Sequence, residues 1–198
     1  GLFTDLIVLL FLGLFLAAQP HLYRYGLLKL VPPGSRERGR DLMDHLHAKL
    51  QRWLFGQFVS MAIVGTLTTI GLWALGIPLA LALGLLAALF EFIPNLGPLL
   101  ASLPAILLGL TISPQQALFV ILLYLAVQTL ESQLIYPVVQ RKAVELPPAL
   151  TISVQLLVGV VLGAFGFILA TPLLVVAIGL VEKLYIEEQP EENGRQTG

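Results

Sequence analysis

The chain has 198 residues, 57% of them apolar and only 12% charged, and its mean hydropathy is +0.89. Soluble domains carry about 25% charged residues, so this composition excludes an ordinary soluble domain and predicts an integral membrane protein embedded in the lipid bilayer. The net charge of −1 argues against a nucleic-acid partner, and the lack of cysteine excludes disulfides and thiolate metal sites.

Seven apolar runs follow one another along the chain. A spanning helix needs about 20 mostly apolar residues, with a range of about 17–25. Three runs reach that length, at residues 2–18, 58–74 and 117–136. Four shorter runs form two pairs, 78–92 with 96–111 and 149–162 with 165–184. The sequence therefore predicts an all-α, polytopic membrane bundle in which the short pairs are broken or re-entrant helices.

The basic residues indicate how these helices are oriented. Cytoplasmic loops are enriched in Lys and Arg. With seven crossings, all three basic regions fall on one side of the membrane, which places the linker 19–57 and the tail 187–198 in the cytoplasm, the tail as a disordered end. The chain opens with Gly inside an apolar run, so we expect residues 1–198 to be the C-terminal part of a longer transmembrane domain. The basic residues are Arg24, Lys29, Arg36, Arg38, Arg40, Lys49 and Arg52, then Arg141 and Lys142, then Lys183 and Arg195.

Within the linker, residues 35–55 form a predicted amphipathic helix. Apolar side chains recur at three- and four-residue steps and end at Trp53. Such a helix lies on the lipid headgroups with Trp53 as an anchor, packs on a neighbouring subunit, or packs on its own protein. His45 and His47 are two residues apart and do not share a helix face, so the sequence predicts no metal site and no cofactor.

The segment Phe92-Ile93-Pro94-Asn95-Leu96-Gly97-Pro98 interrupts one apolar pair. Backbone groups that a break frees inside a membrane must be buried in protein or line a cavity, and many transporters build binding sites from discontinuous helices. A second predicted break contains Gly163 and Gly166, and Pro172, also predicted to break the helix, follows it as Pro104 follows the first. Two such hairpins of opposite orientation would form an inverted repeat, a known transporter architecture.

Glu131 is the first candidate for a functional side chain. It lies in an apolar run, where a carboxylate is costly and by default marks an ion site, a proton relay or a solute pathway. Gln128, three residues earlier, is on the same helix face and can share a hydrogen bond with it. The alternative is that Glu131 only joins helices, or reaches water at the membrane interface.

Glu91, Asn95 and Gly97 are the other candidates, at the first break. The start of a half-helix after Gly97 would offer unpaired N–H groups to an anion or polar ligand, and the end of the preceding arm would offer carbonyls to a cation. The alternative is a capping and turn role.

Small residues recur every four positions from Gly76 to Ala88, and Gly159 and Gly163 repeat that spacing, which favours tight helix packing. Hydrolase and phosphate-loop motifs are missing, so we do not expect an enzyme.

These motifs resemble the AI-2E family of transporters, the autoinducer-2 exporter-like permeases. The resemblance rests on Leu50-Gln-Arg-Trp53-Leu-Phe-Gly56-Gln57, Ile70-Gly-Leu-Trp-Ala-Leu-Gly76-Ile-Pro78 and the Phe92–Pro98 segment. It continues through Gln128-Thr-Leu-Glu131-Ser-Gln-Leu-Ile-Tyr-Pro137, Glu145-Leu-Pro-Pro148, Gly163-Ala-Phe-Gly166 and Ala170-Thr-Pro172.

The resemblance implies a multi-pass, homo-oligomeric transport protein of the bacterial inner membrane. It implies export of a small polar solute such as autoinducer-2, or antiport of sodium or lithium against protons. A third hypothesis, from a different class, is a membrane scaffold that transports nothing. Glu131 and the paired breaks favour transport, because a scaffold needs neither.

Overall fold

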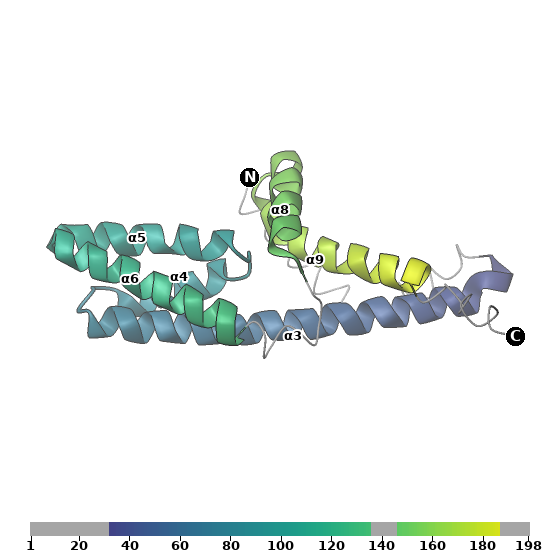
Figure 1. Cartoon of the computed structure of the whole chain (residues 1–198), viewed down its shortest axis with the longest axis horizontal. Helices are drawn as coiled ribbons and strands as arrows, with labels where there is room; N and C mark the ends of the chain where they lie inside the picture. Colours follow the sequence, from purple (N-terminus) through teal and green to yellow (C-terminus); the bar gives the residue numbers. More distant parts are fainter. Residues whose placement is uncertain (1–31, 136–145, 187–198) are drawn as a thin grey trace, which may run out of the picture. The chain divides into compact units, whose positions relative to one another are not determined.

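The computed structural model describes residues 32–135 and 146–186, and all regular structure within these ranges is helical (Figure 1). This confirms the predicted all-α fold. The predicted span at 2–18, the basic pair Arg141 and Lys142, and the tail 187–198 lie outside the described residues. In chain order the helices are η1 (Pro33–Ser35), α3 (Arg36–Ala74), α4 (Ala80–Phe90), α5 (Leu96–Ile112), α6 (Pro114–Leu130), η2 (Glu131–Ile135), α8 (Pro148–Leu162), α9 (Ala164–Val181) and η3 (Glu182–Ile186).

The chain divides after His47 into two compact units, Gly1–His47 and Ala48–Gly198. In the first unit the structure describes η1 and the start of α3. All packing discussed below belongs to the second unit.

α3 joins two segments that the sequence predicts separately, the amphipathic helix 35–55 and the span 58–74. Gly56 lies between them but does not end the helix, because an interior glycine costs only about 1 kcal/mol relative to alanine.

Three helices among the described residues are long and apolar enough to cross a membrane: α3, α6 extended through Leu134, and α9 extended through Leu184. α4, α5 and α8 are apolar but shorter. The 11 residues of α4 extend about 16 Å, well short of a core about 30 Å thick. α4 is therefore too short to cross on its own.

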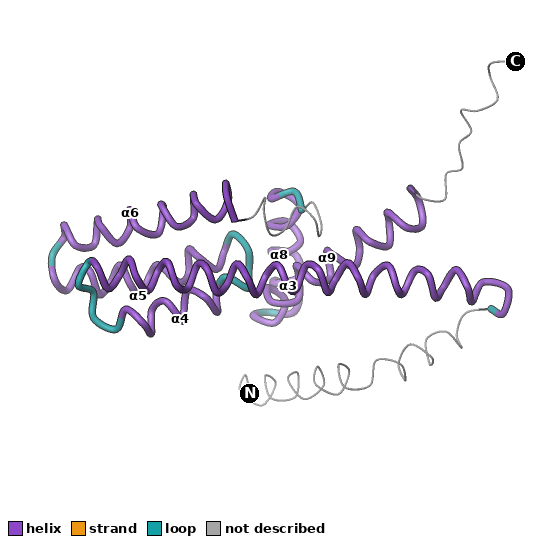
Figure 2. The backbone as a smooth tube through the Cα atoms, turned by 90° about the horizontal axis from the view of Figure 1, so that it is seen from below, coloured by secondary structure: helices purple, strands orange, loops and turns teal. Residues whose placement is uncertain are grey.

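α4, α5 and α6 run alongside the C-terminal half of α3 (Figure 2). Their shared core is closed by small or fully buried side chains, among them Leu72, Ala101, Ala105 and Val120. Gln116 Nε2 donates to the carbonyl oxygen of Leu75 and so ties the start of α6 to the end of α3.

The small residues of α4 serve close packing within the chain. A Cβ at Gly84 would lie 1.8 Å from Thr69 Oγ1, and one at Gly65 would lie 2.6 Å from the Cβ of Ala88. α3 and α4 can approach this closely only because Gly65 and Gly84 have no side chain.

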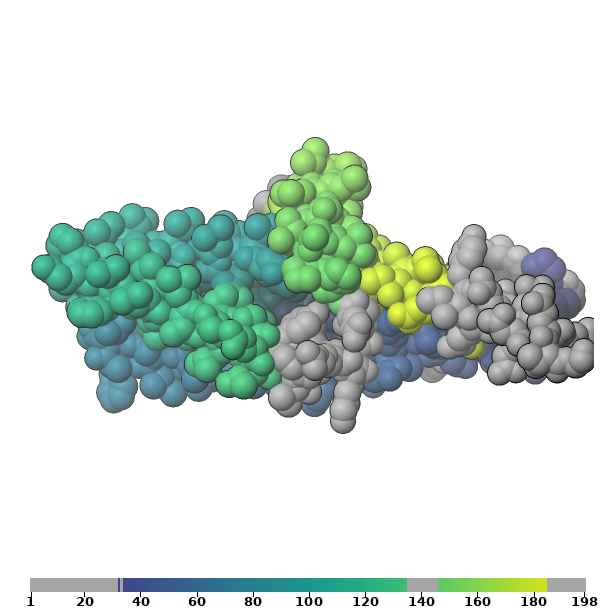
Figure 3. Space-filling model, viewed as in Figure 1, coloured from purple at the N-terminus to yellow at the C-terminus, as the bar shows by residue number. Residues whose placement is uncertain are grey.

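α8 and α9 form a second helical hairpin that turns at Gly163 (φ 64°, ψ −144°). The predicted break at Gly166 is wrong, since this residue and Pro172 both lie inside α9. Gly166 instead permits close packing, because a Cβ there would lie 2.1 Å from the carbonyl oxygen of Val158. α8 carries exposed apolar side chains, including Leu157, Val160 and Val161, as expected of a helix that faces lipid or another subunit. Figure 3 shows the atoms of α8, in light green, at the surface.

Trp53 lies in a separate core cluster with Leu146, Leu174 and Val175. Its ring meets Phe92 edge to face, with the centroids 5.9 Å apart. The indole is almost fully buried, so the interpretation of Trp53 as a headgroup anchor is wrong, and this side chain packs inside its own protein.

Candidate functional site

The α4–α5 break is a tight turn closed by its own backbone. Ile93 N–H donates to the Phe90 carbonyl at 2.9 Å, and Gly97 N–H donates to the Ile93 carbonyl at 2.8 Å. A Cβ at Gly97 would lie 1.8 Å from the Phe90 carbonyl oxygen, so glycine is required there for the close approach of two backbone segments. Pro98 falls in the first turn of α5, where proline is tolerated because the first N–H groups of a helix have no intrahelical acceptor.

Asn95 is the N-cap of α5 and has a φ of 68°. Few residues other than glycine adopt positive φ, although asparagine does so more readily than most. The turn therefore selects asparagine partly for its backbone, independently of any ligand.

Two buried glutamines bind the carbonyl groups of this turn from other helices. Gln57 Nε2 of α3 donates to the Glu91 carbonyl at 2.6 Å, and Gln155 Nε2 of α8 donates to the Pro94 carbonyl at 3.0 Å. Both side chains are almost completely buried. Two of the carbonyls that the break frees are thus satisfied by side chains of other helices, as a break within hydrocarbon would require.

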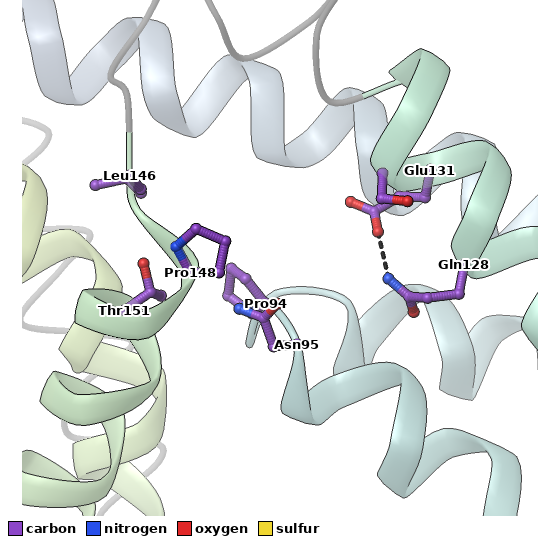
Figure 4. A pocket seen from close by; sticks show the side chains of 8 residues that line it. Pro94, Asn95, Gln128, Glu131, Leu146, Pro148 and Thr151 are labelled. Atoms are coloured by element: carbon purple, nitrogen blue, oxygen red, sulfur yellow. Dashed lines mark hydrogen bonds between the residues drawn. The ribbon is translucent and has the colours of Figure 1, made fainter.

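Beside the turn lies a pocket of about 180 Å³ (Figure 4). Three segments that are distant in sequence supply its lining: the α4–α5 turn, the end of α6 with η2, and the start of α8. The lining residues are Pro94, Asn95, Gln128, Glu131, Ser132, Leu146, Pro148 and Thr151.

Within the pocket, Gln128 Nε2 donates to Glu131 Oε2 at 2.6 Å, the pairing that their spacing predicts. The structure therefore brings together Asn95, Gln128 and Glu131 from the candidate set. Gly97 does not line the pocket, and its N–H is already engaged with Ile93. It supports the turn and offers no free donor to a ligand.

Glu91 is the first residue after α4 and is not part of the pocket lining. Its side chain is 2% exposed, and Oε2 has no hydrogen-bond partner among the described residues. Its carboxyl group is near enough to Glu131 for their charges to repel each other. Protonation of either carboxyl would relieve that repulsion.

Several site residues were missed by sequence reasoning, namely Gln57, Gln155, Thr151 and Ser132. Gln57, Thr151 and Gln155 are polar residues inside or beside apolar runs, and they are buried in the structure. Polarity within the apolar runs was the available signal, but only carboxylates, Gln128 beside Glu131, and residues next to the breaks were considered from the sequence.

The pocket combines one carboxylate, two amides and two hydroxyls. Amides and hydroxyls both donate and accept hydrogen bonds, whereas an ionised carboxylate only accepts. This set of groups can hold a small solute rich in hydroxyl or carbonyl groups, or a cation with its remaining water. The volume is below the range of about 300–1,000 Å³ typical of sites for drug-sized ligands, which favours a small ligand.

Comparison with known proteins identifies relatives over most of the chain. The model of the AI-2E family transporter matches residues 1–186. "Putative transport protein YueF" of Bacillus subtilis is 32% identical over 162 residues, which cover 82% of this chain and 44% of that protein. "Putative transport protein YrrI" of the same organism is 28% identical over 162 residues, 82% of this chain and 46% of that protein. The chain spans about half the length of these relatives.

Proposed function

The chain belongs to the AI-2E transporter family, and we propose that the pocket beside the α4–α5 break binds the solute that the whole protein moves across the bacterial inner membrane. The observation that carries this proposal is the convergence of Asn95, the Gln128–Glu131 pair and Thr151 at a helix break. In hydrocarbon each of these polar groups is costly. Their convergence from three segments at one pocket is what a solute site needs and a scaffold does not.

The solute that fits is small and polar, with autoinducer-2 as the candidate that the family name supplies. The second candidate function is antiport of sodium or lithium against protons. Glu91 favours this second function, because its side chain is 2% exposed, its Oε2 has no hydrogen-bond partner among the described residues, and a buried carboxylate in an apolar helix bundle by default marks an ion site or a proton relay. The homo-oligomeric state stays a prediction, for which the exposed apolar side chains of α8 offer a surface.

The test is a flux assay on the full-length protein in liposomes. Uptake of labelled autoinducer-2 is measured with and without a pH or sodium gradient, and a trapped pH dye reports proton movement when sodium or lithium is added. Autoinducer-2 uptake supports the first function, and cation-dependent proton movement supports the second. A protein that assembles normally but gives neither signal is a scaffold under these conditions, which would overturn the proposal.

Two variants locate the site. Glu131→Gln should abolish coupled flux, with Glu37→Gln as its control, because Glu37 is an exposed glutamate far along the sequence from the pocket residues. Asn95→Gly removes the amide without the strain that alanine would add at φ 68°. Its control is Leu79→Gly, at an exposed position with φ 59° that does not line the pocket. Wild-type flux in both pocket variants would rule out this pocket as the site.

A further inference from the structure

Gln155 links the α8–α9 hairpin to the turn between α4 and α5. Its side chain is 0% exposed, and Nε2 donates both to the Pro94 carbonyl at 3.0 Å and to Thr171 Oγ1 at 3.4 Å. Pro94 belongs to the α4–α5 turn and Thr171 to α9. A single amide on α8 thus contacts the break on one side and the partner helix of its own hairpin on the other.

The orientation of this amide follows from its partners. A backbone carbonyl can only accept a hydrogen bond, so the group that faces Pro94 must be the NH₂ end of the amide. Oε1 then points elsewhere, and it has no hydrogen-bond partner among the described residues. A buried amide that leaves its oxygen without a hydrogen bond is costly. This cost indicates that Gln155 is needed at this position for the NH₂ group that it donates.

The bond from Gln155 acts directly on the pocket. The carbonyl of Pro94 and the nitrogen of Asn95 share one planar peptide group. A donor fixed on the Pro94 oxygen therefore limits rotation of that plane, and with it the orientation of Asn95 in the pocket. Leu96 N–H holds the same oxygen at 2.9 Å, but only from within the turn. Gln155 supplies the link to another element.

Thr171 connects this link to α9. Its side chain is 1% exposed, and it precedes Pro172, which has no N–H to donate to the helix. Thr151, one helical turn before Gln155 on α8, lines the pocket. A displacement of the α8–α9 hairpin would thus move Thr151 in the pocket and would also change the orientation of the peptide group between Pro94 and Asn95.

We propose that Gln155 is a positioning residue that couples the α8–α9 hairpin to the solute pocket through the Pro94 carbonyl. The inference rests on the proposed function of the pocket. Transporters expose a site alternately by moving one group of helices against another. Here the hairpin is the moving group, and the bond from Gln155 to Pro94 is made in the conformation described and broken when the hairpin moves away.

The coupling is measured by the accessibility of position 151 in the full-length protein. These 198 residues contain no cysteine, and any cysteine elsewhere in the protein is replaced by serine. Thr151→Cys then places one thiol at a pocket position that is 3% exposed. Its rate of reaction with a charged methanethiosulfonate reagent in liposomes reports how often the hairpin leaves the break.

Adding Gln155→Met keeps a long side chain but removes the donor. A net hydrogen bond is worth about 0.5–1.5 kcal/mol, so the labelling rate should rise about twofold to tenfold. Thr171→Val removes only the weaker contact and should raise the rate less. Ser153→Ala, on the exposed side of α8 where Ser153 bonds only within its own helix, is the matched control and should change nothing.

Transport kinetics distinguish a coupling role of Gln155 from a role in stability alone. They are measured with the substrate that the flux assay identifies. Gln155→Met should change the maximal rate and KM by different factors, because it alters the balance of conformations without removing a pocket group. If Gln155→Met does not assemble, Thr171→Val carries the test. An unchanged labelling rate in the assembled variants would overturn the coupling even if Glu131→Gln abolishes flux. Conversely, faster labelling with normal flux in the pocket variants would leave the coupling intact and reject the pocket.

Discussion

Replacing Gly97 with alanine tests whether the α4–α5 break depends on a close backbone contact. A Cβ at this position lies 1.8 Å from the Phe90 carbonyl oxygen and 2.5 Å from its carbon. To reach even 3.0 Å from that oxygen, the start of α5 and the end of α4 must separate by 3.0 − 1.8 = 1.2 Å. The obstacle is backbone, so no side-chain rotation can relieve it.

The cost of Gly97→Ala has two parts. Overpacking of a tight contact costs about 1–3 kcal/mol. The Phe90 carbonyl also accepts from Ile93 N–H at 2.9 Å, and the loss of that bond costs about 0.5–1.5 kcal/mol. We therefore expect a destabilisation of roughly 2–4 kcal/mol, together with displacement of Asn95, which lies two residues away.

The assay is unfolding of the full-length protein in mixed micelles by increasing SDS, followed by flux in liposomes. Gly34→Ala is the matched control, because a Cβ at Gly34 meets nothing within 4 Å and its backbone needs no positive φ. Equal stability of Gly97→Ala and Gly34→Ala would refute the argument that the break is held by this contact.

Two further predictions concern the α8–α9 hairpin. Gly163→Ala should cost about 1–3 kcal/mol through backbone strain alone, because φ is 64° while nothing lies within 4 Å of a Cβ there; an unchanged midpoint in SDS titration would contradict this. Lys49 pairs with Glu182 at the end of α9, where the glutamate side chain is 39% exposed. A double-mutant cycle of Lys49→Met and Glu182→Gln should therefore give a coupling of only about 1 kcal/mol after solvent screening, and a coupling of zero would reject the pair as a tether for the hairpin.

The helices were predictable because their apolar runs are long and sharply bounded. Each of the two short pairs appears as two helices, and the first break falls at residues 91–95, where Pro94 precludes a continuous helix. Gly166 was misassigned because the sequence does not distinguish a glycine needed for close packing from one needed for a turn. Only Gly163 of that segment has a positive φ.

The candidate site was predictable only along a single helix. Gln128 and Glu131 are three residues apart, so their pairing follows from helix geometry. The contacts of Gln57 with Glu91 and of Gln155 with Pro94 join residues that are 34 and 61 positions apart. Such contacts depend on how the hairpins pack, which periodicity does not encode.

Helix lengths also constrain the depth of the pocket in the membrane. α5 and α6 contact each other and are joined at Ser113, and each has 17 residues, or about 25 Å. Asn95 immediately precedes α5 and Glu131 immediately follows α6, so the pocket lies at the end of both helices that is distant from Ser113. The seven-crossing topology predicted from the Lys and Arg distribution would place Ser113 at the outer interface and the pocket toward the cytoplasmic side of a core about 30 Å thick.

Under that topology and the proposed function, a pocket at that depth would exchange solute with the cytoplasm. The path to the outside is then blocked by the packed core between the pocket and Ser113, whose members Leu72, Ala101, Ala105 and Val120 are all 0% exposed. Ala101, Ala105 and Val120 are small or β-branched, so the helices pack in close contact here. These three residues have no long side chain whose rotation could open a path. On the proposed function, opening toward the outside would separate whole helices, and the proposed link through Gln155 would transmit such a movement from the α8–α9 hairpin to the break.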